Sequence, residues 1–262
     1  MSTVLCIGDL HTKAFLLPML DETIAETTPD RIIIMGDYAD DWDMDPAENL
    51  SAVRTILTWA RDHENLTMLF GNHDMAYYSR SGKCSGNAIS IREELHGLIN
   101  ENLKVMHLAE SAGNWLFTHA GLCQAWALDN LDVPIDAHDA AQQINGLIDD
   151  GYGKVRDEIE ACGRARGGFE KPGPLWADWS ELVDDFSPGI NQIVGHTPKW
   201  TCTQVLADSG EQLWLCDTFS TTPFGYPCGD GSMLLLDTET NQVRVIPQKD
   251  STAFQDLYMM GL

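Results

Sequence analysis

Short runs of apolar residues recur along the chain, and many of them end in glycine followed by a polar residue. Three such runs lie within the first 75 residues, at 3–9 (TVLCIGD), 31–37 (RIIIMGD) and 66–74 (LTMLFGNHD). Apolar runs of this length, bounded by turn residues, are typical of buried strands. Each run therefore predicts a strand that ends in a polar loop.

Helical patterns separate these runs. Residues 13–26 have helical spacing, and residues 46–63 predict a stronger helix with Pro46 in its first turn. Two successive strand–helix–strand crossovers predict a parallel, right-handed α/β layer. A further helix is expected at about 88–101, and a further strand at 114–121 (NWLFTHAG).

The second half of the chain has a different pattern. Residues 122–190 are predicted to be mostly helical, and the turn-rich segment 163–176 (GRARGGFEKPGPLW) is a candidate loop or lid. The predicted helices of this part are 136–150 and 154–162, and the predicted strands after it are 192–197, 201–208, 211–218, 232–239 and 242–247. The regular spacing of these strands is typical of an antiparallel-rich sheet.

No repeat, low-complexity tract or linker divides the sequence. We therefore expect one α/β domain over residues 1–262, with two mixed sheets stacked face to face and helices outside. The segment of about 122–190 would be an insertion in this domain and a candidate lid. A chain of 262 residues is long enough to bury a sizeable core.

The charge balance is strongly acidic. Forty aspartates and glutamates stand against 16 lysines and arginines, which gives a formal net charge of −24. Such a chain would be repelled by phosphate polymers, so nucleic acid and anionic membrane surfaces are not expected partners. The acidity is explained by a highly soluble surface, and part of it is also suited to binding divalent cations.

The sequence predicts a cytoplasmic protein. No stretch approaches the roughly 20 apolar residues of a membrane span, and the start MSTVLCIGD lacks the features of a signal peptide. Seven cysteines, an odd number without a CxxC pair, favour reduced thiols rather than a disulfide framework.

Five predicted strands end in residue types that bind metals: GDLH (8–11), GDYAD (36–40), GNHD (71–74), THAG (118–121) and GHT (195–197). The carboxyl ends of strands in open α/β sheets converge on one crevice. Asp, Asn and His suit Mn²⁺, Fe or Zn²⁺ better than they suit a thiolate-bound metal. A single tetrapeptide of this kind is weak, but five of them in this order predict a metal centre.

With these motifs the chain resembles the calcineurin-like metallophosphoesterases over roughly residues 4–240. THAGL (118–122) and the single-histidine GHTP (195–198) make it most similar to the branch that holds phosphoprotein phosphatases and diadenosine tetraphosphatases. The resemblance implies a four-layer α-β-β-α fold. It also implies hydrolysis of phosphate esters with two divalent cations, Mn²⁺ in the first place and Fe or Zn²⁺ as alternatives.

The resemblance further implies a role for each matching residue. The implied metal ligands are Asp9 and His11 for the first ion, Asn72, His119 and His196 for the second, and Asp37 as the bridge between them. His73 would be the general acid that protonates the leaving oxygen, and Asp40 the carboxylate that orients His73. Pro198 stands where many relatives outside this branch have a second histidine, so the first ion would have fewer protein ligands.

The chemistry agrees with these residue types. Two cations about 3.5–4 Å apart can stabilise the attacking and leaving oxygens of an in-line displacement, and a metal-activated hydroxide serves as the nucleophile. Proton donation by a positioned histidine contributes typically about 10²–10⁴-fold. No serine or cysteine nucleophile is then needed.

One residue departs from the pattern of this branch. Asp41 stands where the phosphoprotein phosphatases have an arginine that forms bidentate hydrogen bonds to phosphate. The candidate replacements are Arg80, Lys83, Arg164 and Arg166, and Tyr77 is a candidate for stacking on a nucleobase. The expected substrate is therefore a small phosphorylated molecule or a nucleotide, with a phosphopeptide, and hence a protein serine/threonine phosphatase, as the alternative.

A hypothesis of another class is a metal-binding interaction protein without turnover. The presence of both His73 and Asp40 favours the enzyme, because a protein without catalysis needs neither an acid nor its orienting carboxylate. Trp176 and Trp179, in PLWADW, are equally compatible with a substrate cleft and with core packing.

Overall fold

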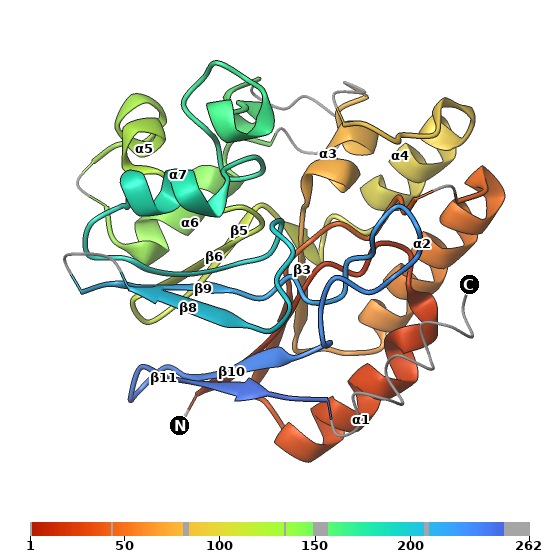
Figure 1. Cartoon of the computed structure of the whole chain (residues 1–262), viewed down its shortest axis with the longest axis horizontal. Coiled ribbons are helices and arrows are strands. Elements are labelled where there is room, and N and C mark those ends of the chain that lie inside the picture. Colours follow the sequence, from red (N-terminus) through yellow and green to blue (C-terminus); the bar gives the residue numbers. More distant parts are fainter. Residues whose placement is uncertain are drawn as a thin grey trace.

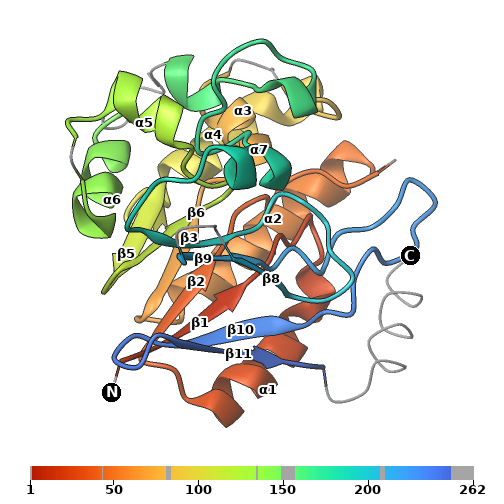
Figure 2. The ribbon, with the colours of Figure 1, turned by 60° about the vertical axis from the view of Figure 1, so that its left-hand side comes forward.

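Two mixed sheets stack face to face, with helices on their outer sides (Figures 1 and 2). The computed structural model of the chain describes residues 2–42, 44–80, 84–133, 135–148, 157–206 and 210–248. The first sheet has the order β11–β10–β1–β2–β3–β4, with β1 (Thr3–Ile7), β2 (Arg31–Ile34), β3 (Leu66–Leu69), β4 (Met106–His107), β10 (Met233–Asp237) and β11 (Gln242–Ile246). The second has the order β5–β6–β7–β9–β8, with β5 (Ala109–Ala112), β6 (Trp115–Thr118), β7 (Asn191–Val194), β8 (Thr203–Leu206) and β9 (Gln212–Leu215).

The helices form two groups, α1, α2 and α4 on one side of the molecule and α5, α6 and α7 on the other (Figure 1). The α-helices are α1 (Leu17–Thr27), α2 (Pro46–Arg61), α3 (Asn72–Tyr78), α4 (Arg92–Asn100), α5 (Gln124–Asn130), α6 (Ala137–Asn145) and α7 (Trp179–Asp184). The 3₁₀ turns are η1 (Ala14–Leu16), η2 (Ile89–Ile91), η3 (Asp157–Glu160) and η4 (Arg164–Arg166). Within the described ranges, no helix combines the length and the apolar character needed to cross a membrane.

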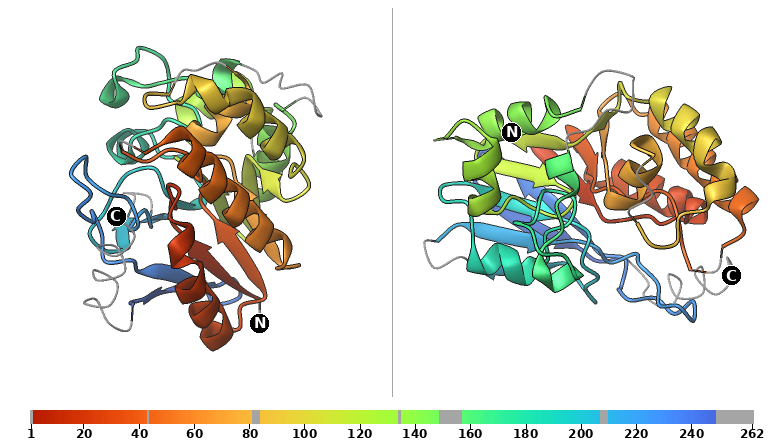
Figure 3. Two further views of the ribbon diagram at one scale, coloured as in Figure 1. Left: turned by 90° about the vertical axis from the view of Figure 1, so that its right-hand side faces the viewer. Right: turned by 90° about the horizontal axis from the view of Figure 1, so that it is seen from above.

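Both faces of the central strands β1, β2 and β3 are largely buried, which explains why these strands are apolar runs. On β1, Val4 and Cys6 pack into the core between the two sheets, whereas Leu5 and Ile7 pack into the core under the helices. The strand β2 alternates in the same way, and the parallel register pairs Cys6 with Ile33. The view from above shows the helices of the two groups flanking the sheets (Figure 3). The predicted α/β fold with two stacked mixed sheets is confirmed.

The C-terminal strands differ from the prediction in their pairing. β7 is parallel to β6 and to β9, and only β8 joins this part of the sheet in antiparallel fashion. β10 and β11 belong to the first sheet, where β10 pairs with β1 and β11 pairs with β10. The connection between β9 and β10 is long enough to carry the chain from one sheet to the other, and strand spacing alone does not reveal the partner of a strand.

The segment 122–190 packs against the second sheet. Its helix α6 lies against β5 and β6, and the buried Trp126 donates a hydrogen bond from Nε1 to the carbonyl of Glu158 at 2.8 Å. Of the helix predicted at 154–162, residues 157–160 form a 3₁₀ turn, and residues 154–156 lie with the rest of 149–156 outside the described residues. A single domain with a lid remains a prediction.

Candidate active site

Residues in the loops after β1, β2, β3, β7 and β9 line one cavity of about 340 Å³. Four predicted metal ligands lie in these loops and line the cavity: His11 after β1, Asp37 after β2, Asn72 after β3 and His196 after β7. His119, after β6, is fully buried and is not part of the cavity wall. In parallel arrangements these strand ends lie at the same edge of the sheet, so residues far apart in sequence come together.

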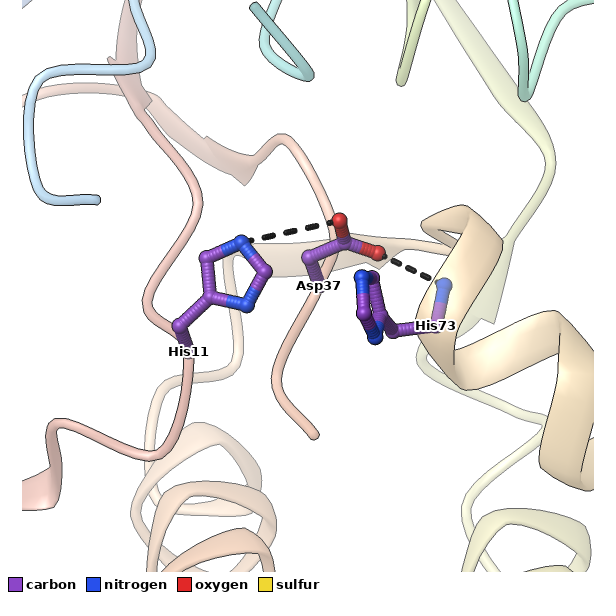
Figure 4. A group of neighbouring side chains, drawn as sticks. All are labelled: His11, Asp37 and His73. Carbon is purple, nitrogen blue, oxygen red and sulfur yellow. Dashed lines mark hydrogen bonds and ion pairs between the residues drawn. The ribbon is translucent and has the colours of Figure 1, made fainter. Parts of the chain in front are cut away.

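Asp37 lies between two groups of side chains that could each hold a metal ion. His11 and His73 form one group with it, and His119 and His196 form the other, with the ligand atoms of each group within 4.8 Å of one another. The Oδ2 atom of Asp37 is 3.7 Å from Nε2 of His11 and 3.4 Å from Nε2 of His119. Figure 4 shows His11 and His73 on opposite sides of the Asp37 carboxylate. A carboxylate in this position has the geometry of a bridging ligand.

Asn72 and Asp9 border the same centre. The side-chain oxygen of Asn72 is 2.9 Å from Nε2 of His119. One oxygen of Asp9 accepts the backbone N–H of His196 at 2.8 Å. The other oxygen, Oδ1, is buried and has no hydrogen-bond partner in the described part of the chain, and the same holds for Nε2 of His196. Asp9 thus lies beside the two groups around Asp37 but belongs to neither of them.

These buried donors fit divalent cations. Burial, then the neighbouring carboxylates of Asp217 and Asp37, raise the pKa of Asp9 well above its usual range. Burial also raises the pKa of Asp217 to about 6, against the hydrogen bonds from Ser220. Buried carboxylates and orphaned ligand atoms are unfavourable in the absence of a compensating positive charge. The set of carboxylate, amide and imidazole donors is the set that Mn²⁺, Fe and Zn²⁺ accept.

The imidazoles of the centre are in the form that binds metals. Burial lowers the pKa of His196 well below its ordinary value, and it lowers the pKa of His11 to about 4. Burial likewise lowers the pKa of His119, against the charge of Asp37. These rings are therefore neutral at neutral pH, as a histidine ligand must be.

The backbone holds several of these residues in the left-handed region. The φ angles are 40° at His11, 51° at Asp37, 63° at Asp40 and 64° at His196. Such conformations cost about 1–3 kcal/mol each in residues other than glycine and cluster at functional sites. Close packing also requires glycine at position 71, because a Cβ atom there would lie 2.0 Å from Oδ1 of Asp37.

His73 and Asp40 form a hydrogen-bonded pair at the cavity. Nδ1 of His73 is 2.9 Å from Oδ2 of Asp40. The Asp40 carboxylate also accepts hydrogen bonds from Asn49 Nδ2 at 2.7 Å and from Asn87 Nδ2 at 2.7 Å. Burial opposes a charge on His73, but the charge of Asp37 and the hydrogen bond to Asp40 raise the pKa of His73 well above its ordinary value. These two carboxylates therefore favour the protonated form of the His73 imidazole.

Tyr77, the candidate for stacking on a nucleobase, points toward Asp40 and does not line the cavity. Its side chain is fully buried, and its hydroxyl donates a hydrogen bond to Oδ1 of Asp40 at 2.6 Å. Tyr77 lies on the inward face of α3, one turn after His73, so it supports the carboxylate that orients this histidine. The sequence alone does not separate these two uses of a tyrosine beside a catalytic loop.

Asp74 is a further residue whose function the sequence did not reveal. Its carboxylate accepts hydrogen bonds from the backbone N–H groups of Gly71 at 3.0 Å, Tyr38 at 2.9 Å and Ala39 at 3.2 Å. It therefore ties the loop after β2 to the start of α3 and fixes Asp37 relative to His73. The sequence signal is a carboxylate at the third position of a short helix.

Of the predicted substrate-binding cations, Arg166 lines the cavity. Arg80 instead forms an exposed ion pair with Glu93, with Nη2 and Oε2 3.0 Å apart, and it is not part of the cavity wall. Arg164 is also outside the wall, and Lys83 lies outside the described residues.

Arg166 is anchored through one end of its guanidinium. Nη2 donates to Oγ1 of Thr197 at 2.7 Å and lies 3.2 Å from Oδ2 of Asp178. Its Nε is buried and has no hydrogen-bond partner among the described residues. The guanidinium thus has a fixed position at the cavity wall, where Arg166 is one of the lining residues.

Asp41 is not an unpaired negative charge at the substrate site. It forms a salt bridge with the buried Lys13, with Nζ and Oδ2 2.7 Å apart, and it accepts the hydroxyl of Thr221 at 2.8 Å. Burial opposes the charge on Asp41, but Lys13 keeps the pKa of this carboxyl below its ordinary value. The negative charge of Asp41, at the position where phosphoprotein phosphatases have an arginine, is therefore balanced by Lys13. None of the sequence motifs indicated this lysine.

Comparison with known proteins agrees with this geometry. A model of the calcineurin-like phosphoesterase family matches residues 2–208. The chain belongs to this family. No curated protein sequence matches this family member significantly.

Several solved structures are similar to this calcineurin-like phosphoesterase, and one of them, with a TM-score above 0.5, supports its fold. A protein serine/threonine phosphatase from Saccharomyces cerevisiae aligns at 12% identity with a TM-score of 0.53, covering 95% of this chain and 81% of that one. A hypothetical protein from Pyrococcus horikoshii OT3 aligns at 13% identity and TM-score 0.49, over 100% and 94% of the two chains. A novel archaeal phosphodiesterase aligns at 13% identity and TM-score 0.39, over 94% and 99%.

Proposed function

We propose that this protein hydrolyses phosphate esters of small molecules or nucleotides, with two divalent cations as cofactors and His73 as the general acid. The observation that supports this most directly is the position of the Asp37 carboxylate between His11 on one side and His119 and His196 on the other, with the His73–Asp40 pair at the same cavity. When bound, the cations would supply Lewis acidity and activate water for an in-line displacement. The residues that would hold them are Asp9, His11, Asp37, Asn72, His119 and His196.

The chain's own residues then divide the remaining work. His73 donates a proton to the leaving oxygen, with its Nδ1 held by Asp40 and its ring beside the thiol of Cys84 at the cavity. Asp40 fixes the ring orientation through a carboxylate that is itself held by Asn49, Asn87 and Tyr77. Arg166 binds a phosphate oxygen with the donor capacity that Thr197 and Asp178 do not use.

Replacing Arg166 with methionine should raise KM by about 10–100-fold and lower kcat less, since a charged hydrogen bond to the bound phosphate contributes about 1.5–3 kcal/mol. Arg164 offers a matched control, because it belongs to the same 3₁₀ turn but not to the cavity wall. Steady-state kinetics of Arg166→Met and Arg164→Met would be compared. Equal KM values for the two variants would contradict the assignment of Arg166.

The proposal as a whole is tested by turnover of p-nitrophenyl phosphate and bis-p-nitrophenyl phosphate with Mn²⁺. We expect hydrolysis of at least one of them, loss of activity in EDTA and recovery on addition of Mn²⁺. A panel of nucleotides, phosphorylated small molecules and phosphopeptides would then identify the substrate class. Binding of Mn²⁺ without turnover of any of these esters would refute the proposal and would instead identify a metal-binding interaction protein.

A further inference from the structure

The cavity has an aromatic wall that the chemistry above does not use. Trp42 lines the cavity, and 59% of its surface is exposed. Given the proposed phosphoesterase function, we infer that Trp42 stacks against a planar, uncharged ring on the leaving group of the substrate. The substrate class is then a phosphate ester of a ring-bearing alcohol, either a nucleoside monophosphate or an aryl phosphate.

Trp42 is held in a fixed orientation from two sides. Its indole N–H donates to the carbonyl oxygen of Thr221 at 2.8 Å, and its backbone N–H donates to Oδ1 of Asp41 at 2.8 Å. The same Oδ1 accepts the hydroxyl of Thr221, while Oδ2 pairs with Lys13. The loop after β2 and the loop after β9 are thus joined through Asp41 and Trp42. A ring that is already ordered loses little conformational freedom when a ligand binds to it.

The position of Trp42 in the chain relates it to the leaving group. It follows by two residues Asp40, the carboxylate that orients His73. Since His73 protonates the leaving oxygen, the loop that carries Asp40 and Trp42 borders the leaving-group side of the centre. Trp176 also lines the cavity, but its ring packs edge-on against the ring of His196, with the centroids 5.9 Å apart. Trp176 therefore shields a metal ligand, and Trp42 offers the exposed face.

The charges around Trp42 restrict what can bind there. Asp41 and Asp217 both line the cavity, and each interacts with a residue of the loop after β9, Asp41 with Thr221 and Asp217 with Ser220. Lys13 balances the charge of Asp41, so a leaving group with its own negative charge would be repelled mainly by the carboxylate of Asp217. A neutral planar ring avoids this repulsion and gains the stacking interaction. The cavity volume of about 340 Å³ lies in the range of small-ligand sites.

The test compares ring-bearing with aliphatic phosphate esters. The ring-bearing substrates are adenosine 5′-monophosphate and phosphotyrosine, and the aliphatic ones are glycerol phosphate and phosphoserine. In Trp42→Ala the ratio of kcat/KM for ring-bearing over aliphatic substrates should fall about tenfold, mainly through KM, and Trp42→Phe should retain most of it. Comparing adenosine 5′-monophosphate with phosphotyrosine shows whether Trp42 favours a nucleobase or an aryl ring.

Trp200 supplies a matched control, because it is 61% exposed and does not line the cavity. Trp200→Ala should keep the wild-type ratio. An unchanged ratio in Trp42→Ala, or an equal loss for all four substrates, would overturn the inference. If the wild type hydrolyses no phosphate ester, the proposed function fails separately. In that case, calorimetry would measure the affinity for adenosine 5′-monophosphate in the presence of Mn²⁺. Equal affinities of wild type and Trp42→Ala would show that Trp42 does not stack on the ring.

Discussion

Replacing His73 with glutamine should lower kcat for an alkyl phosphate by about 10²–10⁴-fold, the usual contribution of general acid–base catalysis. The imidazole lies between the charge of Asp37 and the carboxylate of Asp40, which together raise its pKa and keep the proton on the ring. Glutamine can still form a hydrogen bond to Asp40 but has no proton to donate to an alkoxide. The steady-state rate with glycerol phosphate and Mn²⁺ is the measurement.

The identity of the leaving group makes this prediction specific. p-Nitrophenolate leaves without much protonation, so the loss in His73→Gln should be much smaller for p-nitrophenyl phosphate than for glycerol phosphate. The matched control is His63→Gln, since His63 also lies beside an aspartate, 3.4 Å from Asp21, and has a similar side-chain exposure, 21% against 20%. Equal losses with both substrates, together with loss of bound Mn²⁺, would show that His73 is a metal ligand and not the acid.

Much of the fold and of the candidate site could be predicted because both depend on local patterns. A strand buried on both faces must be apolar throughout, so β1, β2 and β3 are visible as runs. The strand ends converge by topology alone, so Asp37 and His119 come together although 82 positions separate them in sequence. The polar residues at these ends therefore indicate one centre before any coordinates are known.

The remaining features depend on long-range contacts that local patterns do not encode. Lys13 follows a metal-ligand motif without any signal of its own, yet it neutralises Asp41 across 28 positions of sequence. Tyr77 has the residue type expected for base stacking, but the helix α3 turns it inward toward Asp40. The pairing of β10 with β1 also depends on a long-range contact. The spacing of apolar residues predicts that a strand exists, but it does not predict which strand lies beside it.

Replacing Asp37 with asparagine should abolish the stable binding of both cations and lower kcat/KM by about a thousandfold or more. Lewis-acid stabilisation by the metals contributes several kcal/mol, and each 1.36 kcal/mol corresponds to a factor of ten. Asparagine is the sharpest substitution for two reasons. Asparagine tolerates the left-handed backbone at φ 51°. Its side-chain oxygen can also still accept the backbone N–H of His73, which in the wild type is 2.9 Å from Oδ1 of Asp37.

Metal content separates this prediction from simple misfolding. After Mn²⁺ loading and dialysis, we expect Asp37→Asn to lose both ions while its thermal unfolding without metal stays close to wild type. His196→Ala removes a ligand from only one of the two groups around Asp37, so it should lose one ion and keep the other. The exposed Asp62, on the far end of α2, gives the control Asp62→Asn with full metal content. If Asp37→Asn retained both ions, Asp37 would not be the bridging ligand. Its position in both groups of potential ligands would then need an explanation other than metal binding.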